Sequence, residues 1–154
     1  MKALVFALIA ATAAVAAPAH ARPSQCPDPA KARGDIEQTI RDFFDALRTR
    51  ETAPFKQVTT EGFYAFDVGE RFDGRALADV IVEALEEGVE ISWNLGPMNT
   101  KVRCDVAWSQ WENTGSAGTP PKVNPARWLE SAVLVYEDER WKIDFFHSQR
   151  GKQK

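Results

Sequence analysis

The sequence predicts an α+β fold in which helices from the first half of the chain pack on a curved antiparallel sheet formed mainly by the second half. Two patterns support this prediction. Apolar residues recur at helical spacing between Asp35 and Glu87, whereas apolar and polar residues alternate with the period of a strand between Ile91 and His147. All five tryptophans lie in the alternating half, where strands can bury large aromatic side chains.

The first half is expected to contain an arm, two helices and a short strand. Residues 22–34 hold Pro23, Pro27 and Pro29 and are expected to be extended. A helix is predicted from Asp35 to about Arg50, because Asp35 and Gln38 resemble a capping box. Its apolar stripe is Ile36, Ile40, Phe43, Phe44 and Leu47. A strand over residues 63–66 and a helix over residues 75–87, stopped by Gly88, follow.

The second half is expected to form long antiparallel strands. Residues 91–95 and 102–113 alternate, and residues 128–137 and 140–147 predict a hairpin that turns at Asp138 and Glu139. Residues 114–126 hold two glycines and three prolines, and we expect a long loop there. Residues 132–135 are apolar on both faces of their strand, which predicts a homodimer interface.

The first 21 residues have the pattern of a secretory signal peptide. Lys2 is followed by an apolar run from Ala3 to Ala17 and by a small-residue cleavage site that ends at Ala21. We therefore expect a periplasmic or secreted protein without a membrane anchor after cleavage, whose single domain spans residues 35–150. Two cysteines of an exported chain usually pair, so a disulfide between Cys26 and Cys104 is expected.

Composition makes several classes of protein improbable. The formal net charge of the chain is −3, so there is no basic excess to bind nucleic acid. After cleavage His147 is the only histidine, and the two cysteines lack the spacing of a zinc site. Phosphate-binding glycine loops and hydrolase motifs are absent from the sequence. We expect neither a metal nor a cofactor.

Two segments and their order resemble a known family. Residues 72–77 (FDGRAL) lead into the second helix, and residues 140–148 (RWKIDFFHS) end the last strand. Over residues 35–148 the chain resembles the NTF2-like superfamily, in particular its SnoaL-like branch. The resemblance implies a cone-shaped fold, a pocket between helices and sheet, and frequent homodimers. It does not define the function, because this fold carries isomerases, cyclases, dehydratases, binding proteins and scaffolds.

Asp67 and His147 are the candidate catalytic residues. Asp67 follows an aromatic strand where the ketosteroid isomerases of this superfamily carry their base, and a pocket would raise its pKa. The alternative is a turn aspartate bound to the backbone of Val68 and Gly69. If its strand is regular, His147 shares a face with Trp141, Ile143 and Phe145 and points into the pocket. The alternative is a histidine that caps the core.

The resemblance also has departures that limit the chemistry. Phe43 and Phe44 stand on the helix where ketosteroid isomerases carry a tyrosine, so that activity is not expected. The dehydratases of the superfamily use more than one histidine, which the mature chain lacks.

The preferred hypothesis is that the chain binds a small apolar molecule in a tryptophan-lined pocket. The candidate ligand-binding residues are Trp93, Trp108, Trp141 and Tyr64, and the alternative for the tryptophans is a purely structural role in the core. One alternative function is a cofactor-independent, isomerase- or cyclase-like enzyme that transfers a proton through Asp67 or His147. Another is a scaffold or partner-binding module.

Overall fold

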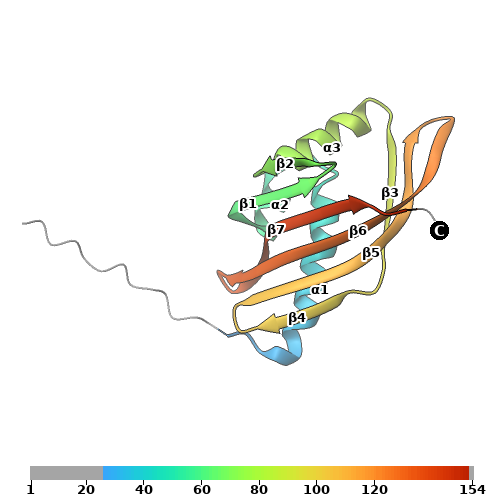
Figure 1. Cartoon of the computed structure of the whole chain (residues 1–154). Helices are drawn as coiled ribbons and strands as arrows, with labels where there is room; N and C mark the ends of the chain where they lie inside the picture. Colours follow the sequence, from blue (N-terminus) through green and yellow to red (C-terminus); the bar gives the residue numbers. More distant parts are fainter. Residues whose placement is uncertain (1–25, 153–154) are drawn as a thin grey trace, which may run out of the picture.

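A curved mixed sheet covers one side of the molecule, and three helices lie behind it (Figure 1). The computed structural model describes residues 26–152, so the predicted signal peptide and residues 22–25 of the predicted arm lie outside the described residues. The helices are α1 (Pro29–Ala46), α2 (Thr52–Val58) and α3 (Ala76–Glu86). None of these helices combines the length and the hydrophobicity needed to span a bilayer within residues 26–152.

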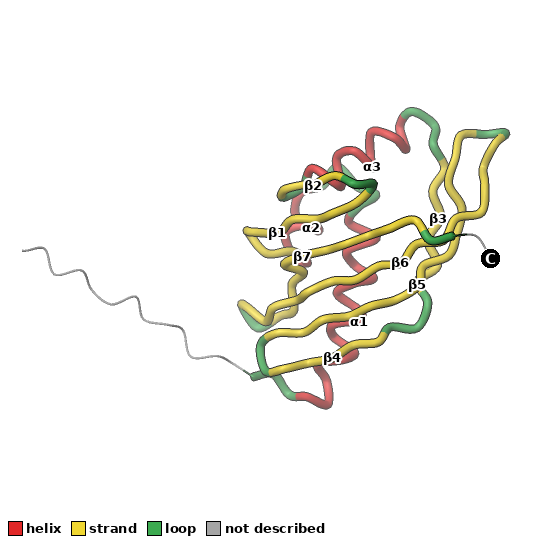
Figure 2. Tube along the Cα trace, viewed as in Figure 1, coloured by secondary structure: helices red, strands yellow, loops and turns green. Residues whose placement is uncertain are grey.

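The sheet has seven strands in the order β2-β1-β7-β6-β5-β3, and β4 also pairs with β5 (Figure 2). The strands are β1 (Thr59–Asp67), β2 (Glu70–Asp73), β3 (Glu90–Leu95), β4 (Asn99–Arg103), β5 (Val106–Thr119), β6 (Lys122–Glu137) and β7 (Arg140–Arg150). β1 runs parallel to β7, and all other pairs are antiparallel. The predicted α+β class is confirmed, and the sheet is mixed rather than wholly antiparallel.

The first helix begins earlier than predicted. α1 starts at Pro29, and the carboxylate of Asp28 accepts a hydrogen bond of 2.9 Å from the backbone N–H of Ala30. Asp28 is therefore the N-cap. The prediction of an extended arm over residues 22–34 is wrong for residues 29–34, which belong to α1. Proline fits the first turn of a helix, where its missing N–H has no intrahelical acceptor, so Pro29 begins α1 rather than preventing it.

The loop predicted over residues 114–126 is also wrong. β5 and β6 continue as a long hairpin that turns at Pro120 and Pro121, and β3 pairs with its β5 side. Gly115 allows this pairing, because a Cβ atom there would lie 2.0 Å from the backbone oxygen of Ser92. Pro125 is tolerated because β7 pairs with β6 only from Trp128 onward.

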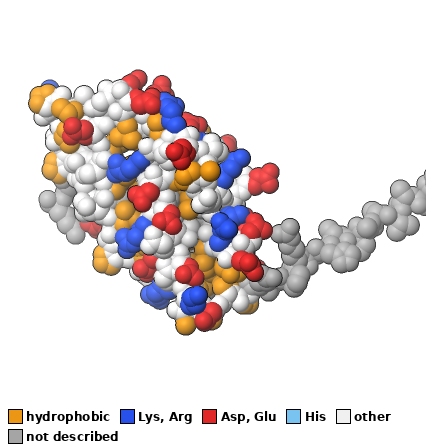
Figure 3. Space-filling model, turned by 180° about the vertical axis from the view of Figure 1, so that it is seen from behind, with side chains coloured by type: hydrophobic (Ala, Val, Ile, Leu, Met, Phe, Trp, Pro, Cys, Tyr) orange, Lys and Arg blue, Asp and Glu red, His pale blue; other side chains and the backbone are white. Residues whose placement is uncertain are grey.

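The core lies between α1 and the inner face of the sheet. The rings of Phe43 and Phe146 have centroids 5.1 Å apart, and Phe43 also packs on Phe55 and Phe63. Ile36, Ile40 and Leu47 of the predicted stripe are buried there. Acidic and basic side chains are interspersed over the helix side of the molecule (Figure 3).

A disulfide joins Cys26 to Cys104, as predicted, with their Cα atoms 4.3 Å apart. Cys104 lies in the turn between β4 and β5, and Cys26 lies just before α1. The bond therefore attaches the start of the first helix to the far edge of the sheet, across 78 positions of sequence.

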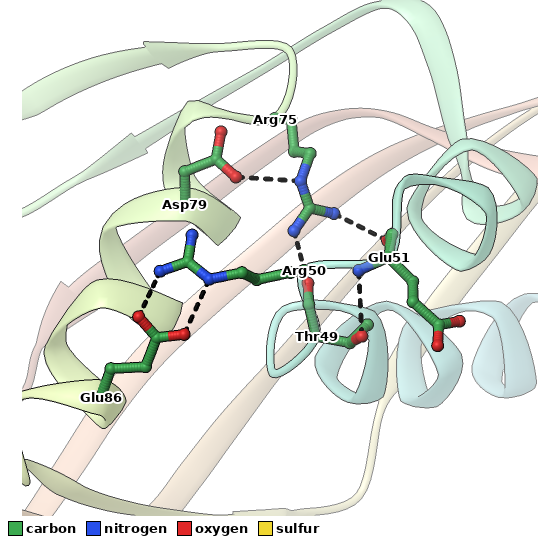
Figure 4. A network of polar contacts seen from close by, with 6 residues as sticks. All are labelled: Thr49, Arg50, Glu51, Arg75, Asp79 and Glu86. Carbon is green, nitrogen blue, oxygen red and sulfur yellow. Dashed lines mark hydrogen bonds and ion pairs between the residues drawn. The ribbon is translucent and has the colours of Figure 1, made fainter.

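Two arginines attach α3 to the connection between α1 and α2 (Figure 4). The guanidinium of Arg75 donates to the backbone oxygens of Thr49 and Glu51 and to the carboxylate of Asp79. Arg50 forms two hydrogen bonds with the carboxylate of Glu86 at the other end of α3. The arginine of the FDGRAL segment thus holds a helix in place.

We expect Arg75→Ala to lower the free energy of unfolding by about 2 kcal/mol, because two backbone oxygens would lose a charged donor. Urea denaturation measures this loss. The matched control is Arg71→Ala, whose exposed guanidinium pairs with Asp73 and lies 4.1 Å from the ring centroid of Tyr64, so its removal should cost less than about 1 kcal/mol. Equal effects of the two substitutions would contradict the anchoring role of Arg75.

Candidate functional site

A pocket of about 600 Å³ opens between the helices and the inner face of the sheet. Its apolar walls are Phe44 and Leu47 of α1, Leu77 and Ile81 of α3, Ile91 and Trp93 of β3, Ala117 of β5, Trp128 of β6 and Phe146 of β7. The pocket therefore has the size and the apolar lining that are usual for small-molecule sites. The helix α3, held by Arg75, forms one of its walls.

A row of polar side chains crosses the inner face of the sheet. Trp111 of β5 is the register partner of Glu130 of β6, which is in turn the partner of Ser148 of β7. Asp67 of β1 lies beside Ser148, because the preceding residues Phe66 and His147 are paired in parallel. Asp67, Glu130 and Ser148 all line the pocket.

Glu130 is the most buried ionisable group of the row, with 5% of its surface exposed. One of its oxygens, Oε2, accepts hydrogen bonds from Trp111 Nε1 at 2.6 Å and from Asn113 Nδ2 at 3.1 Å. The pKa of Glu130 is raised to about 7, mainly by burial and also by the negative charge of Asp67, although these hydrogen bonds and one with Ser148 oppose the shift. Near neutral pH this carboxyl can therefore gain or lose a proton.

Asp67 is half-buried and combines both of the roles considered from the sequence. Its carboxylate accepts a hydrogen bond of 2.9 Å from the backbone N–H of Val68, as the turn interpretation expects. It also lines the pocket, and burial raises its pKa despite that bond and a second one with Ser148. Two carboxyl groups with raised pKa values therefore share one pocket.

His147 lies on a different face from the one predicted. Val133 pairs with Phe145 and Leu134 pairs with Ile143, so Asp144 is an extra residue that forms a bulge in β7. The bulge reverses the alternation, and Phe146 points inward while the side chain of His147 points outward. His147 borders the pocket, but it also borders a depression on the outer face of the sheet. The expected grouping with Trp141 and Ile143 is wrong.

The four predicted ligand-binding residues are dispersed. Only Trp93 lines the pocket, where its ring packs 5.4 Å from that of Phe44 and carries the guanidinium of Arg48 at 4.2 Å. Trp141 is buried in the core, 2% exposed. Trp108 pairs with Val133 on the outer face, and Tyr64 packs there on Phe145.

Sequence reasoning missed Glu130, Ser148 and Trp128, which line the pocket. A signal for Glu130 existed, because it shares strand parity with the apolar residues Trp128, Ala132 and Leu134. An acid at a core-facing position is costly unless it has hydrogen-bond partners, and it often marks a functional site. Within residues 26–152, no group of three or more His, Cys, Asp or Glu residues is placed to hold a metal ion.

The fold is shared with solved structures of low sequence identity. It is similar to an NTF2-like protein with a cystatin-like fold from Novosphingobium aromaticivorans, with a TM-score of 0.68 and 15% identity over 81% of this chain and 85% of that one. It is also similar to a ketosteroid isomerase-like protein from Erwinia carotovora atroseptica, with a TM-score of 0.64 and 15% identity over 82% of this chain and all of the other, 100%.

A third similar structure is the CaMKII hub of S. rosetta, with a TM-score of 0.64 and 15% identity over 81% of this chain and 98% of that one. No family model matches the sequence, and no curated protein matches it either. The chain has the NTF2-like fold, so the resemblance is confirmed at that level. That the chain belongs to the SnoaL-like branch stays a prediction.

Proposed function

We propose that the protein binds a small, largely apolar molecule in the pocket between the helices and the sheet. One observation carries this proposal: a pocket of about 600 Å³ has apolar walls and includes the polar row of Asp67, Ser148 and Glu130 in its lining. Apolar walls provide affinity, and a few polar groups orient the ligand. The side chains therefore leave a space suited to a ligand, whereas a cone filled by side chains would favour a scaffold.

The test is binding of N-phenyl-1-naphthylamine, a neutral dye that fluoresces in apolar sites. Ile81→Trp would place a large ring into the pocket from α3 and should weaken dye binding at least tenfold. The matched control is Val80→Trp. Val80 precedes Ile81 on the same helix, and its side chain is exposed and lies outside the lining of the pocket. No saturable binding by the wild type, or equal loss in both variants, would count against the proposal.

A second candidate function is proton transfer on such a ligand. The observation that favours it is the presence of two carboxyl groups with raised pKa values at one pocket, Asp67 and Glu130. Asp67 would act as the base, and a protonated Glu130 would donate a hydrogen bond to the negative charge that develops. In such an enzyme Asp67→Asn would abolish turnover while ligand affinity stays close to normal.

We also propose that the protein forms a homodimer through the outer face of the sheet. Tyr64, Phe66 and Phe145 pack together there, with ring centroids 5.0 to 5.7 Å apart, and Phe66 is 42% exposed. Leu129 and Val106 are also exposed on this face, 45% and 39% respectively. An exposed apolar surface of this kind is typical of an interface. A solved structure with the same fold is a hub domain, which also favours assembly.

Val133→Glu is expected to convert the dimer into a monomer, because it would bury an unpaired charge at that interface. Within the apolar stretch of residues 132–135, Leu134 is fully buried in the core, whereas Val133 faces outward beside Trp108. Sedimentation velocity at micromolar concentration measures the change. Val80→Glu on α3 introduces the same charge away from the outer face and should leave the dimer intact. A monomeric wild type would disprove the proposed dimer.

Export is the third part of the proposal, with residues 1–21 removed as a signal peptide. The disulfide between Cys26 and Cys104 supports it, because such bonds persist in oxidising compartments. Sequencing the N-terminus of the protein recovered from the periplasm or the medium tests the predicted cleavage after Ala21. An uncleaved N-terminus there would contradict it.

A further inference from the structure

The polar row of the pocket has too few hydrogen-bond donors for its two carboxyl groups. Trp111 and Asn113 both donate to one oxygen of Glu130, Oε2. The backbone N–H of Val68 donates to Asp67. The hydroxyl of Ser148 lies between the two carboxyl groups and has a single proton, so it can donate to only one of them at a time. Further donors would have to come from a ligand or from water.

The charge of the pocket is also unbalanced at this row. The wall residues contributed by α1, α3, β3 and β5 are uncharged. The residues of the described lining that can carry a positive charge are His147 and Arg150, both on β7. The side chain of His147 points to the outer face, and the exposed guanidinium of Arg150 lies 4.7 Å from the ring centroid of Trp128. Both groups lower the pKa of Asp67, but neither has a hydrogen bond with it or with Glu130.

We propose that the ligand of this pocket is an amine: an apolar body with a protonated amino group that the carboxyl groups of Asp67 and Glu130 bind together. An ammonium carries three donors and no acceptor, which matches a row that is rich in acceptors. A hydroxyl would supply one donor and no charge. This inference rests on the proposed function, since it names the chemical class of the molecule that the pocket binds.

A cationic ligand would lower the pKa of Glu130 and so oppose the effect of burial, which raises it. In the free protein burial favours the protonated carboxyl, with a pKa of about 7, whereas a bound ammonium favours the carboxylate. Binding therefore releases a proton at pH 6 and almost none at pH 8, so the affinity for the amine should rise about tenfold between these values. A neutral ligand that accepts a hydrogen bond from Glu130 would show the opposite dependence.

The experiment compares 1-naphthylmethylamine with 1-naphthalenemethanol, which share an apolar body and differ in the charged group. Calorimetry at pH 6 and pH 8, in buffers of different ionisation enthalpy, measures affinity and proton release. We expect the amine to bind at least tenfold more tightly than the alcohol at pH 8 and to release close to one proton at pH 6. Glu130→Gln should remove the pH dependence and reduce the preference for the amine, and Asp67→Asn should also reduce that preference.

The matched control is Glu61→Gln, the same change at an exposed position of β1, which should leave all of these values unchanged. Equal affinity for the alcohol, or amine affinity that falls as the pH rises, would overturn the inference. Binding of the neutral dye without binding of the amine would overturn it too, while the proposed function stands. If neither the dye nor either naphthyl compound binds, both fail together.

Discussion

Replacing Cys26 and Cys104 together by serine is expected to lower the free energy of unfolding by about 4 kcal/mol. The bond closes a segment of 78 positions, and in the chain-entropy model a closed loop of this length restricts the unfolded chain strongly. The native structure should change little, because α1 retains its cap at Asp28 and its packing on the sheet. Urea denaturation measures the loss.

Two further measurements separate the constraint on the unfolded chain from damage to the folded one. Wild-type protein with its disulfide reduced should show the same loss as the double variant, because both lack the same covalent link. The pocket should still bind the neutral dye, since Cys26 and Cys104 lie outside its lining. A loss below about 1 kcal/mol in both forms would show that the bond contributes little to the stability of this fold.

α1 and α3 were predictable because their burial follows one simple period, whereas the short helix α2 was not predicted. Ile36, Ile40 and Phe43 recur at helical spacing and are all fully buried, so the apolar stripe and the core coincide. The start of α1 was missed because proline has opposite effects on a helix at different positions. Inside a helix it breaks the hydrogen bonding, but at the first position after a cap such as Asp28 it fits.

The bulge in β7 was not predictable from alternation. Phe145 and Phe146 are adjacent and both aromatic, so the strand looks equally apolar whichever of them points inward. The extra residue at Asp144 exchanges the inward- and outward-facing positions of the rest of the strand, but the hydrophobic pattern looks the same with or without it. Which of Phe145 and Phe146 points inward depends on the pairing with Val133 and Leu134. The position of His147 therefore followed from tertiary structure, whereas the inward position of Glu130 could be read from its regular strand.

The long hairpin was missed for a related reason. Gly115 and Gly118 resemble loop residues in the sequence, yet each lies where a neighbouring backbone comes too close for a Cβ atom. Glycine in a strand indicates either a turn or a close approach, and only the partner strand distinguishes them. Because of this ambiguity, the sequence did not predict that Ile91 and Ala117 pair and form a wall of the pocket.

Glu130→Gln is expected to stabilise the protein above neutral pH by about 3 kcal/mol. The pKa of Glu130 is raised by folding from its ordinary value of 4.5 to about 7, so the folded state holds the proton more tightly than the unfolded state. Its contribution to stability is complete below about pH 4.5 and is lost as the pH rises through about 7. Glutamine stays neutral, and its oxygen can still accept from Trp111 and Asn113.

The measurement is the difference between the free energies of unfolding of wild type and variant from pH 4 to pH 8, because groups that do not interact with Glu130 contribute equally to both curves. This difference should be small at pH 4, grow in favour of the variant between about pH 5 and pH 7, and level off near pH 8. Glu61→Gln, at an exposed position of β1, should follow the wild type throughout. Parallel curves for wild type and Glu130→Gln would mean that folding leaves the pKa of Glu130 unchanged. Glu130 would then be negatively charged at both pH 6 and pH 8, and the affinity of the pocket for an amine would not change between these values.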